Sequence, residues 1–122
     1  MAIDDRCVTI QPYFMIKEGA VDTVQPILDK FVEQTRSEKD CLYYGFSRNG
    51  NELHCREGYA NAIGALAHLK NIGPLLKETL ESGLIELTEL QVHGPEEELK
   101  ILRAALEDLN PTYWVLENGF RK

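Results

Sequence analysis

The chain has 122 residues, of which 43% are hydrophobic and 27% are charged, and its formal net charge is −7. This length predicts one domain with a substantial core. The negative charge, without any cluster of Lys and Arg, argues against nucleic acid and against an anionic membrane surface as partners. No apolar run approaches the ~20 residues that a membrane-spanning helix needs.

The first predicted element is a strand over residues 6–17. Its even positions are uniformly apolar and its odd positions are mixed, which is typical of a strand with one face on a core. Pro12 has no N–H for a strand partner and therefore predicts a bulge or a sheet edge. Gly19 then ends the strand, and Thr23 is expected to cap a helix that begins at Val24 and ends near Ser37.

A hairpin is predicted next, with strands over 41–48 and 53–59. The turn between them is Asn49-Gly50-Asn51, whose residue types accept the positive φ of tight turns. Asn61 is a good N-cap for a following helix. We expect this helix to stop at residues 71–73 and a separate short helix, residues 75–82, to begin after Pro74.

The remaining chain predicts a fourth strand over 84–93, a helix and a fifth strand over 112–117. Gly94-Pro95 ends the fourth strand, and three glutamates then lie in the helix's first turn, where carboxylates favour the helix dipole. Asn110-Pro111 should end that helix. Its expected buried stripe consists of Leu99, Leu102, Leu106 and Leu109.

This order predicts a ferredoxin-like α+β fold. The first six elements follow the β-α-β-β-α-β plan of an antiparallel sheet with helices on one face. Residues 1–122 form a single domain, with 95–122 as a C-terminal α-β extension. Because the second sheet face carries many apolar side chains and no helix remains to cover it, we expect a two-fold homodimer. Whether the fifth strand extends its own sheet or crosses to the neighbour's is open.

The candidate chemistry lies where the third strand runs into the helix after it. Glu57 and Tyr59 are two residues apart and therefore lie on the same side of their strand. His68 follows two turns into the helix. His68 is a candidate general base, Glu57 a base or an orienting partner for His68, and Tyr59 a hydrogen-bond donor to a substrate oxygen. The alternative is a structural role for each of them.

A mostly apolar wall is expected around these groups. The candidate ligand-binding residues are Tyr13, Met15, Leu53, Cys55 and Trp114, with Cys7 and Thr9 on the same predicted wall. The three cysteines, Cys7, Cys41 and Cys55, are an odd number without a Cys-x-x-Cys pair, which favours reduced thiols in a cytoplasmic protein over disulfides or a metal site. The N-terminus, residues 1–6, lacks the layout of a signal peptide.

Several short motifs resemble the antibiotic-biosynthesis-monooxygenase family. They are Ile10-x-Pro12-Tyr13-Phe14 with Lys17-x-Gly19, Phe31-Val32-Glu33-x-Thr35-x-x-Glu38, Cys41-Leu42-x-Tyr44, and Glu57-Gly58-Tyr59 leading to Ala67-His68-Leu69. The resemblance covers roughly residues 8–94. It implies a dimeric α+β barrel with an internal cavity in each subunit. The chain departs from the family at Lys39-Asp40, where Pro-Gly is common, and in its added C-terminal helix and strand.

Three alternative functions follow, the first and third from the resemblance and the second from the apolar wall. The first is a cofactor-independent monooxygenase acting on a small aromatic or quinol-type compound. The second is a non-catalytic binding protein for an apolar ligand such as a fatty acid. The third is a haem-binding relative with His68 as a ligand. No bound cofactor and no metal are expected for the first two.

Overall fold

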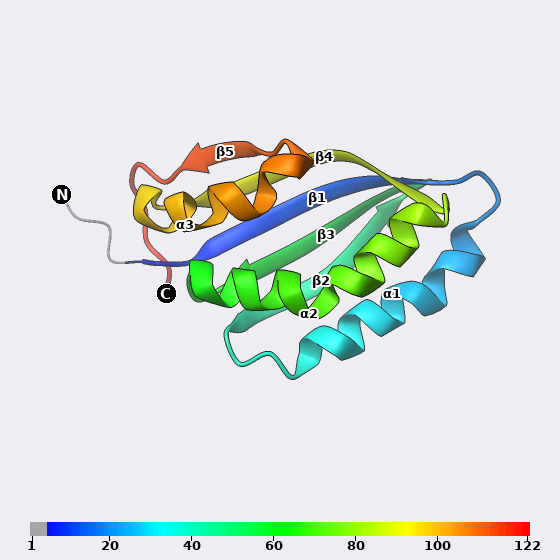
Figure 1. The fold of residues 1–122 in the computed structure, drawn as a ribbon, viewed down its shortest axis with the longest axis horizontal. Helices are drawn as coiled ribbons and strands as arrows, with labels where there is room; N and C mark the ends of the chain where they lie inside the picture. Colours follow the sequence, from blue (N-terminus) through cyan, green and yellow to red (C-terminus); the bar gives the residue numbers. More distant parts are fainter. Residues whose placement is uncertain (1–4) are drawn as a thin grey trace.

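A computed structural model describes residues 5–122, so the first four residues of the N-terminal segment discussed above lie outside it. The five strands form one sheet in the order β2-β3-β1-β4-β5, and the helices cover one of its faces (Figure 1). The elements are β1 (Val8–Ile16), α1 (Val21–Arg36), β2 (Cys41–Asn49), β3 (Glu52–Tyr59), α2 (Ala62–Glu81), β4 (Ile85–Gly94), α3 (Glu96–Leu106), the short 3₁₀ helix η1 (Glu107–Leu109) and β5 (Thr112–Val115). The ferredoxin-like α+β prediction is confirmed.

The central strand β1 pairs antiparallel with β3 on one side and β4 on the other. Its register against β4 shifts between Tyr13 and Phe14, one residue beyond Pro12. The bulge predicted from Pro12 is therefore present, although β1 is not an edge strand. At the sheet edge β5 pairs in parallel with β4, so the fifth strand extends the sheet of its own subunit.

Both helices in the first six elements differ from the sequence prediction. α1 begins at Val21 with Ala20 at its N-cap, so Thr23 lies within the helix and caps nothing. Gly19, at φ 79°, turns the chain earlier than the pattern indicated. Asn61 does cap α2: its side-chain oxygen accepts a hydrogen bond from the Gly64 N–H at 2.8 Å.

α2 is one continuous helix, and the predicted break before Pro74 is wrong. A proline inside a helix costs about 3 kcal/mol because it removes a backbone hydrogen bond and crowds the preceding turn. Ile72 and Thr79 are buried on either side of Pro74, so tertiary packing holds both halves against the same sheet. This continuity carries α2 along the whole length of the site described below.

The C-terminal helix α3 packs its leucines onto the end of the sheet formed by Val8, Ile10 and Val92. Leu99, Leu102 and Leu106 are at most 1% exposed, whereas Leu109 lies in η1 and is 36% exposed. Leu109 is therefore not part of the buried stripe predicted from spacing. Within residues 5–122, no helix is long and apolar enough to cross a membrane.

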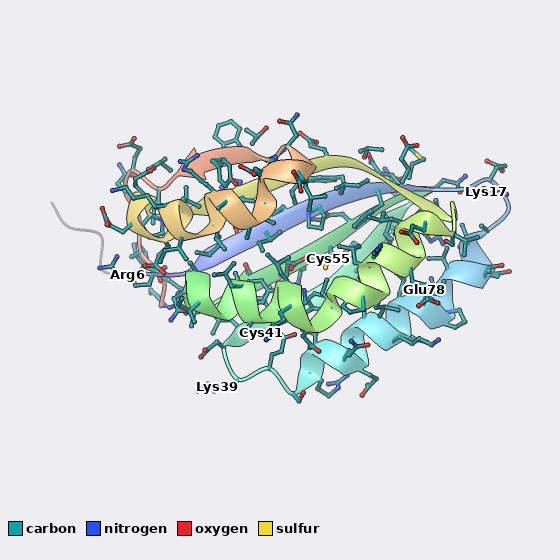
Figure 2. The ribbon with its side chains drawn as sticks, in the orientation of Figure 1. Arg6, Lys17, Lys39, Cys41, Cys55 and Glu78 are labelled. Carbon is teal, nitrogen blue, oxygen red and sulfur yellow. The ribbon has the colours of Figure 1, made fainter. Side chains whose placement is uncertain are left out.

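The three cysteines are free thiols, and of the buried thiols that the sequence predicted only Cys55 is buried. Cys55 is buried in β3, while Cys7 and Cys41 are partly exposed. Figure 2 shows Cys55 in the interior and the charged Lys17 and Lys39 at the periphery.

The packing of α3 yields a stability prediction. Leu102→Ala should lower the free energy of unfolding by about 2–5 kcal/mol, because a fully buried side chain is replaced by a cavity. The neighbouring Ile101, which is 42% exposed, is the matched control, and Ile101→Ala should change stability by less than ~1 kcal/mol. Urea denaturation monitored by circular dichroism measures both. Equal effects would show that α3 does not pack as described.

Candidate functional site

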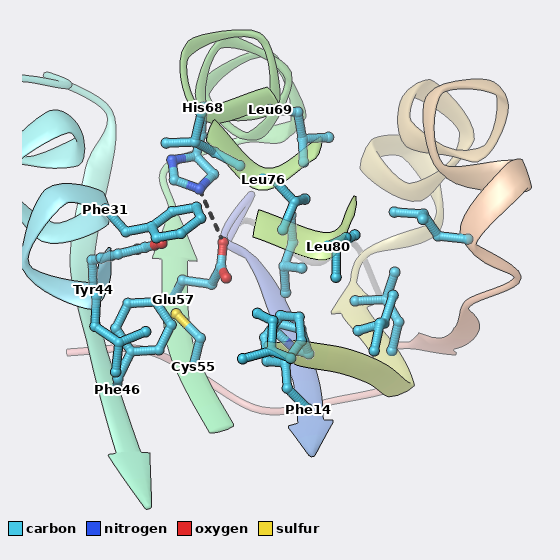
Figure 3. Close-up of a pocket in the computed structure, with 18 of the residues that line it drawn as sticks. Phe14, Phe31, Tyr44, Phe46, Cys55, Glu57, His68, Leu69, Leu76 and Leu80 are labelled. Carbon is cyan, nitrogen blue, oxygen red and sulfur yellow. Dashed lines mark ion pairs between the residues drawn. The ribbon is translucent and has the colours of Figure 1, made fainter. Parts of the chain in front are cut away.

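A cavity lies between the helix-covered face of the sheet and α2. About 650 Å³ of space free of protein atoms lies in and around it, and this figure includes open solvent at its mouth. Only four of its lining residues carry a polar or ionisable side-chain group, and the rest are apolar. These four, Tyr44, Cys55, Glu57 and His68, lie together at one end of the cavity (Figure 3).

Glu57 is the carboxyl group at this end, and it is only 5% exposed. It lies on β3, where alternation places it on the same face as Cys55 and Tyr59. The Tyr59 hydroxyl donates a hydrogen bond of 2.6 Å to Glu57 Oε1. His68 Nε2, from α2, lies 3.5 Å from the same oxygen (Figure 3). The structure brings these three side chains together, as the sequence predicted. Tyr59 does not line the cavity, however, and its hydroxyl donates to Glu57 and not to a substrate oxygen as predicted.

A second carboxylate, Glu38, lies on the other side of the His68 ring. The two Glu38 oxygens are 3.0 and 3.1 Å from His68 Nδ1. The Asn71 side-chain amide donates to Glu38 Oε2 at 2.7 Å and to the backbone carbonyl of Gln34 at 2.8 Å. Glu38 is thereby fixed, and with Nδ1–H donating to it, His68 presents its Nε2 lone pair toward Glu57.

Sequence reasoning missed Glu38 and Asn71 as site residues. Glu38 follows the end of α1 in the turn before β2, and Asn71 was interpreted as a helix stop. Nothing in the local pattern shows that this turn passes against α2. Glu38 does stand in one of the family-like motifs, and that was the signal through which it could have been found.

Burial sets the protonation of these groups. Loss of hydration raises the pKa of Glu57 to about 7, against the opposing hydrogen bonds from Tyr59 and Cys55. Burial lowers the pKa of His68, and this outweighs the hydrogen bond and charge of Glu38, which act to raise it. Near neutral pH the site therefore holds a neutral imidazole beside a carboxyl group that exchanges its proton readily.

The hydroxyl and thiol groups stay protonated. Burial is the largest cause that raises the pKa of Tyr59, Tyr44 and Cys55, and the nearby Glu57 charge adds to it. Tyr59 is therefore a hydrogen-bond donor to Glu57 rather than a source of charge. The centroid of the Tyr44 ring lies 5.2 Å from that of the His68 ring, and Tyr44 lines the cavity next to His68.

The sheet separates the predicted ligand-binding residues into two groups. Leu53 and Cys55 are buried on the same face as Glu57, and of the two only Cys55 lines the cavity. Tyr13, Met15 and Trp114 lie on the opposite, helix-free face. Tyr13 stacks on His54 at 4.2 Å between ring centroids, while Met15 and Trp114 are 44% and 52% exposed. The single wall expected from the sequence, which joined Tyr13 and Met15 to Leu53, is therefore not formed.

The geometry around His68 does not favour a metal or haem site. In the part of the chain that the structure describes, no three His, Cys, Asp or Glu side chains are placed to hold a metal ion. Both ring nitrogens of His68 face carboxyl groups, so ligation of a haem iron by Nε2 would require it to leave Glu57.

Solved structures place this fold among known proteins. The crystal structure of MupZ from Pseudomonas fluorescens matches all of this chain and 94% of MupZ, with 39% identity and a TM-score of 0.93. Rv0793 from Mycobacterium tuberculosis matches 73% of this chain and 94% of its own, with 24% identity and a TM-score of 0.62. A structure described as an antibiotic biosynthesis monooxygenase matches 70% of this chain and 92% of its own, with 20% identity and a TM-score of 0.57. No model of a known protein family and no curated protein matches the chain.

The raised pKa of Glu57 makes a prediction about stability. Between pH 4.5, the ordinary pKa of glutamic acid, and about 7, the folded chain retains a proton that the unfolded chain has released. The free energy of unfolding of the wild-type chain therefore falls as pH rises through this range. Glu57→Gln removes the cause of this fall and keeps an oxygen that can accept from Tyr59. The free energy of unfolding of Glu57→Gln minus that of the wild type should therefore increase by about 3 kcal/mol between pH 4 and pH 8.5.

Chemical denaturation at a series of pH values and one protein concentration measures this difference. Glu33, whose side chain is 71% exposed on α1, provides the control, and the difference between Glu33→Gln and wild type should change far less over this pH range than that of Glu57→Gln. A Glu57→Gln difference that is equally flat would contradict the assigned burial of the charge.

Proposed function

The chain belongs to the antibiotic-biosynthesis-monooxygenase-like family, and on that premise we propose that it is a cofactor-independent monooxygenase-like enzyme acting on a small aromatic or quinol-type compound in the hydrophobic cavity. One observation carries the proposal: a carboxyl group with a pKa of about 7 and a neutral histidine lie side by side at one end of an apolar cavity. A site that needs to accept and return one proton near neutral pH requires such a pair.

The first step that these residues support is removal of a hydroxyl proton from the substrate. Ionised Glu57 accepts the proton, and the Nε2 lone pair of His68, which Glu38 orients toward Glu57, is placed to accept that proton in turn. The resulting phenolate is electron-rich, and the surrounding apolar side chains exclude water from it. Tyr59 keeps Glu57 Oε1 occupied, which leaves Glu57 Oε2 for the substrate.

The oxygenation itself balances without another reductant. A keto tautomer of the substrate with a CH₂ group reacts with O₂ so that one oxygen atom becomes the new carbonyl. The other oxygen atom leaves as water together with the two hydrogens of that CH₂ group. The substrate supplies all the electrons, and the protonated Glu57 returns the proton that the site removed.

A second candidate function is binding of an apolar ligand without turnover. It is favoured by the composition of the cavity wall, where residues outside the group of Tyr44, Cys55, Glu57 and His68 offer no polar side chain. Glu57 would then hold one oxygen of the ligand by a hydrogen bond. In either function the guest is mostly apolar and carries an oxygen at one end.

Oxygen consumption separates the two functions. With 1-naphthol or hydroquinone as probes, wild-type protein should consume O₂ above the rate of the buffer, and this rate should rise with pH through about 7 as Glu57 ionises. Glu57→Gln and His68→Gln should each lose about 100-fold or more, whereas the exposed Glu33→Gln should retain the rate. Absence of any consumption, with an apolar guest released on denaturation and identified by mass spectrometry, would favour the binding function.

We also propose a homodimer formed through the helix-free face of the sheet, in a cytoplasmic protein. That face carries Tyr13, Met15, Tyr43 and Trp114, and the last three are each more than a third exposed. An apolar surface of this kind is unusual on a monomer.

The free thiols support a reducing compartment, which measurement of the thiol state in extracts of the source cells would test.

Sedimentation equilibrium at micromolar concentration should give twice the subunit mass of 13.9 kDa. Tyr13→Glu would place a charge in the centre of the proposed interface and should shift the protein toward monomer. Ile63→Glu is the control, because Ile63 is 61% exposed on α2, on the helix-covered side. A wild-type protein that sediments as a monomer would exclude the dimer.

A further inference from the structure

We propose that α3 and η1 select the substrate: together with α2 and β4 they form an aliphatic channel for an unbranched hydrocarbon tail, which extends from an oxygen-bearing head at Glu57 to an opening at Leu109. This inference rests on the proposed function for the position of the head. It adds the shape of the remaining substrate and the element that recognises it.

The chemistry of the wall changes along the cavity. Near Glu57 the wall is aromatic, with Phe31, Tyr44 and Phe46 on the side of α1 and β2 (Figure 3). Away from them, Leu76 and Leu80 of α2 continue the wall, and Phe14 of β1 is the aromatic side chain in this part (Figure 3). Every lining residue from α2 beyond His68, from β4 and from the C-terminal extension is leucine or isoleucine: Leu69, Ile72, Leu76, Leu80, Ile85, Leu87, Leu90, Leu106 and Leu109.

The exposure of these side chains shows where this part of the cavity opens. Leu90 and Leu106 are 6% and 1% exposed and lie in the interior. Leu109 is 36% exposed, and Leu80 and Leu87 are partly exposed. The opening is therefore bordered by α2, β4 and η1, and its border is aliphatic. A tail that continues past Leu109 would reach solvent without meeting a charged group that lines the cavity.

The lining of the channel argues for an aliphatic guest. Its side chains from α2 beyond His68, from β4 and from the extension are all leucine or isoleucine and offer no hydrogen-bonding group. A chain of methylene groups has the smallest cross-section of any apolar group of comparable length and leaves no polar group unpaired against such a wall. Each buried methylene also contributes favourably to binding.

The extension supplies a wall that the common fold lacks. Structures with about 20% identity match 70–73% of this chain, which is the share that residues 8–94 make up, and nearly all of their own length. MupZ matches the whole chain. Leu106 and Leu109 come from the extension, so the far side of the channel is an addition to the six-element unit. Under this proposal the extension sets the specificity, while Glu57 and His68 lie on the six-element unit.

A series of 4-alkylphenols from ethyl to octyl, measured by isothermal titration calorimetry, tests the channel. The phenol hydroxyl is placed at Glu57 and the alkyl tail in the channel. Affinity for wild-type protein should rise roughly three- to fourfold with each added methylene until the tail reaches Leu109. Leu109→Trp should weaken binding of the octyl compound about tenfold or more and leave the ethyl compound unchanged.

Ile101→Trp is the matched control, because Ile101 lies on α3 and is exposed outside the cavity, and it should change neither affinity. Affinity that does not depend on chain length, or a Leu109→Trp variant that weakens both compounds equally, would overturn the channel. Oxygen consumption by the same compounds reports separately on the chemistry. An affinity that depends on chain length, without oxygen consumption, would support the channel and contradict the oxygenase. Oxygen consumption with an affinity that does not depend on chain length would support the oxygenase and contradict the channel.

Discussion

The site depends on one constraint: the Glu57 carboxyl group is buried in an apolar cavity. An isolated carboxylate in such surroundings is costly, so the group must either keep its proton or be surrounded by donors. Tyr59 supplies a donor at 2.6 Å, and His68 lies 3.5 Å away with its orientation fixed by Glu38. These partners hold Glu57 close to the balance between its two protonation states, and that balance gives an otherwise inert cavity its chemistry.

The fold supports this balance with elements that are distant in sequence. β3 presents Glu57, and the continuous α2 carries His68 over it. The turn after α1 brings Glu38 against α2, where Asn71 holds it. The aliphatic remainder of α2, with β4 and α3, extends the same apolar environment away from the site. A helix broken at Pro74 would have separated the end of the cavity at Glu57 from its outer part.

The sequence predicted the order of the elements well because strand alternation and turn residues are local signals. Glu57 and Tyr59 were paired on one face by the two-residue period, and Asn61 marked the start of α2. Three features depend on tertiary contacts and were not predicted: the continuity of α2 through Pro74, the role of Glu38, and the face occupied by Tyr13. Tyr13 lies opposite His54 in the β1–β3 register, and His54 alternates with the residues that face the cavity. Alternation alone could not show this, because it assigns the two faces within each strand and not between strands.

The protonation of Glu57 can be observed directly. Difference infrared spectroscopy between pH 5 and pH 9, with Glu57→Gln as the reference, isolates the carboxyl C=O stretch of this one residue. The account predicts a protonated carboxylic acid band from an apolar environment that disappears with a midpoint near pH 7. A Glu57 carboxyl group that has already ionised by pH 5, as an ordinary exposed glutamate would have, would contradict the account.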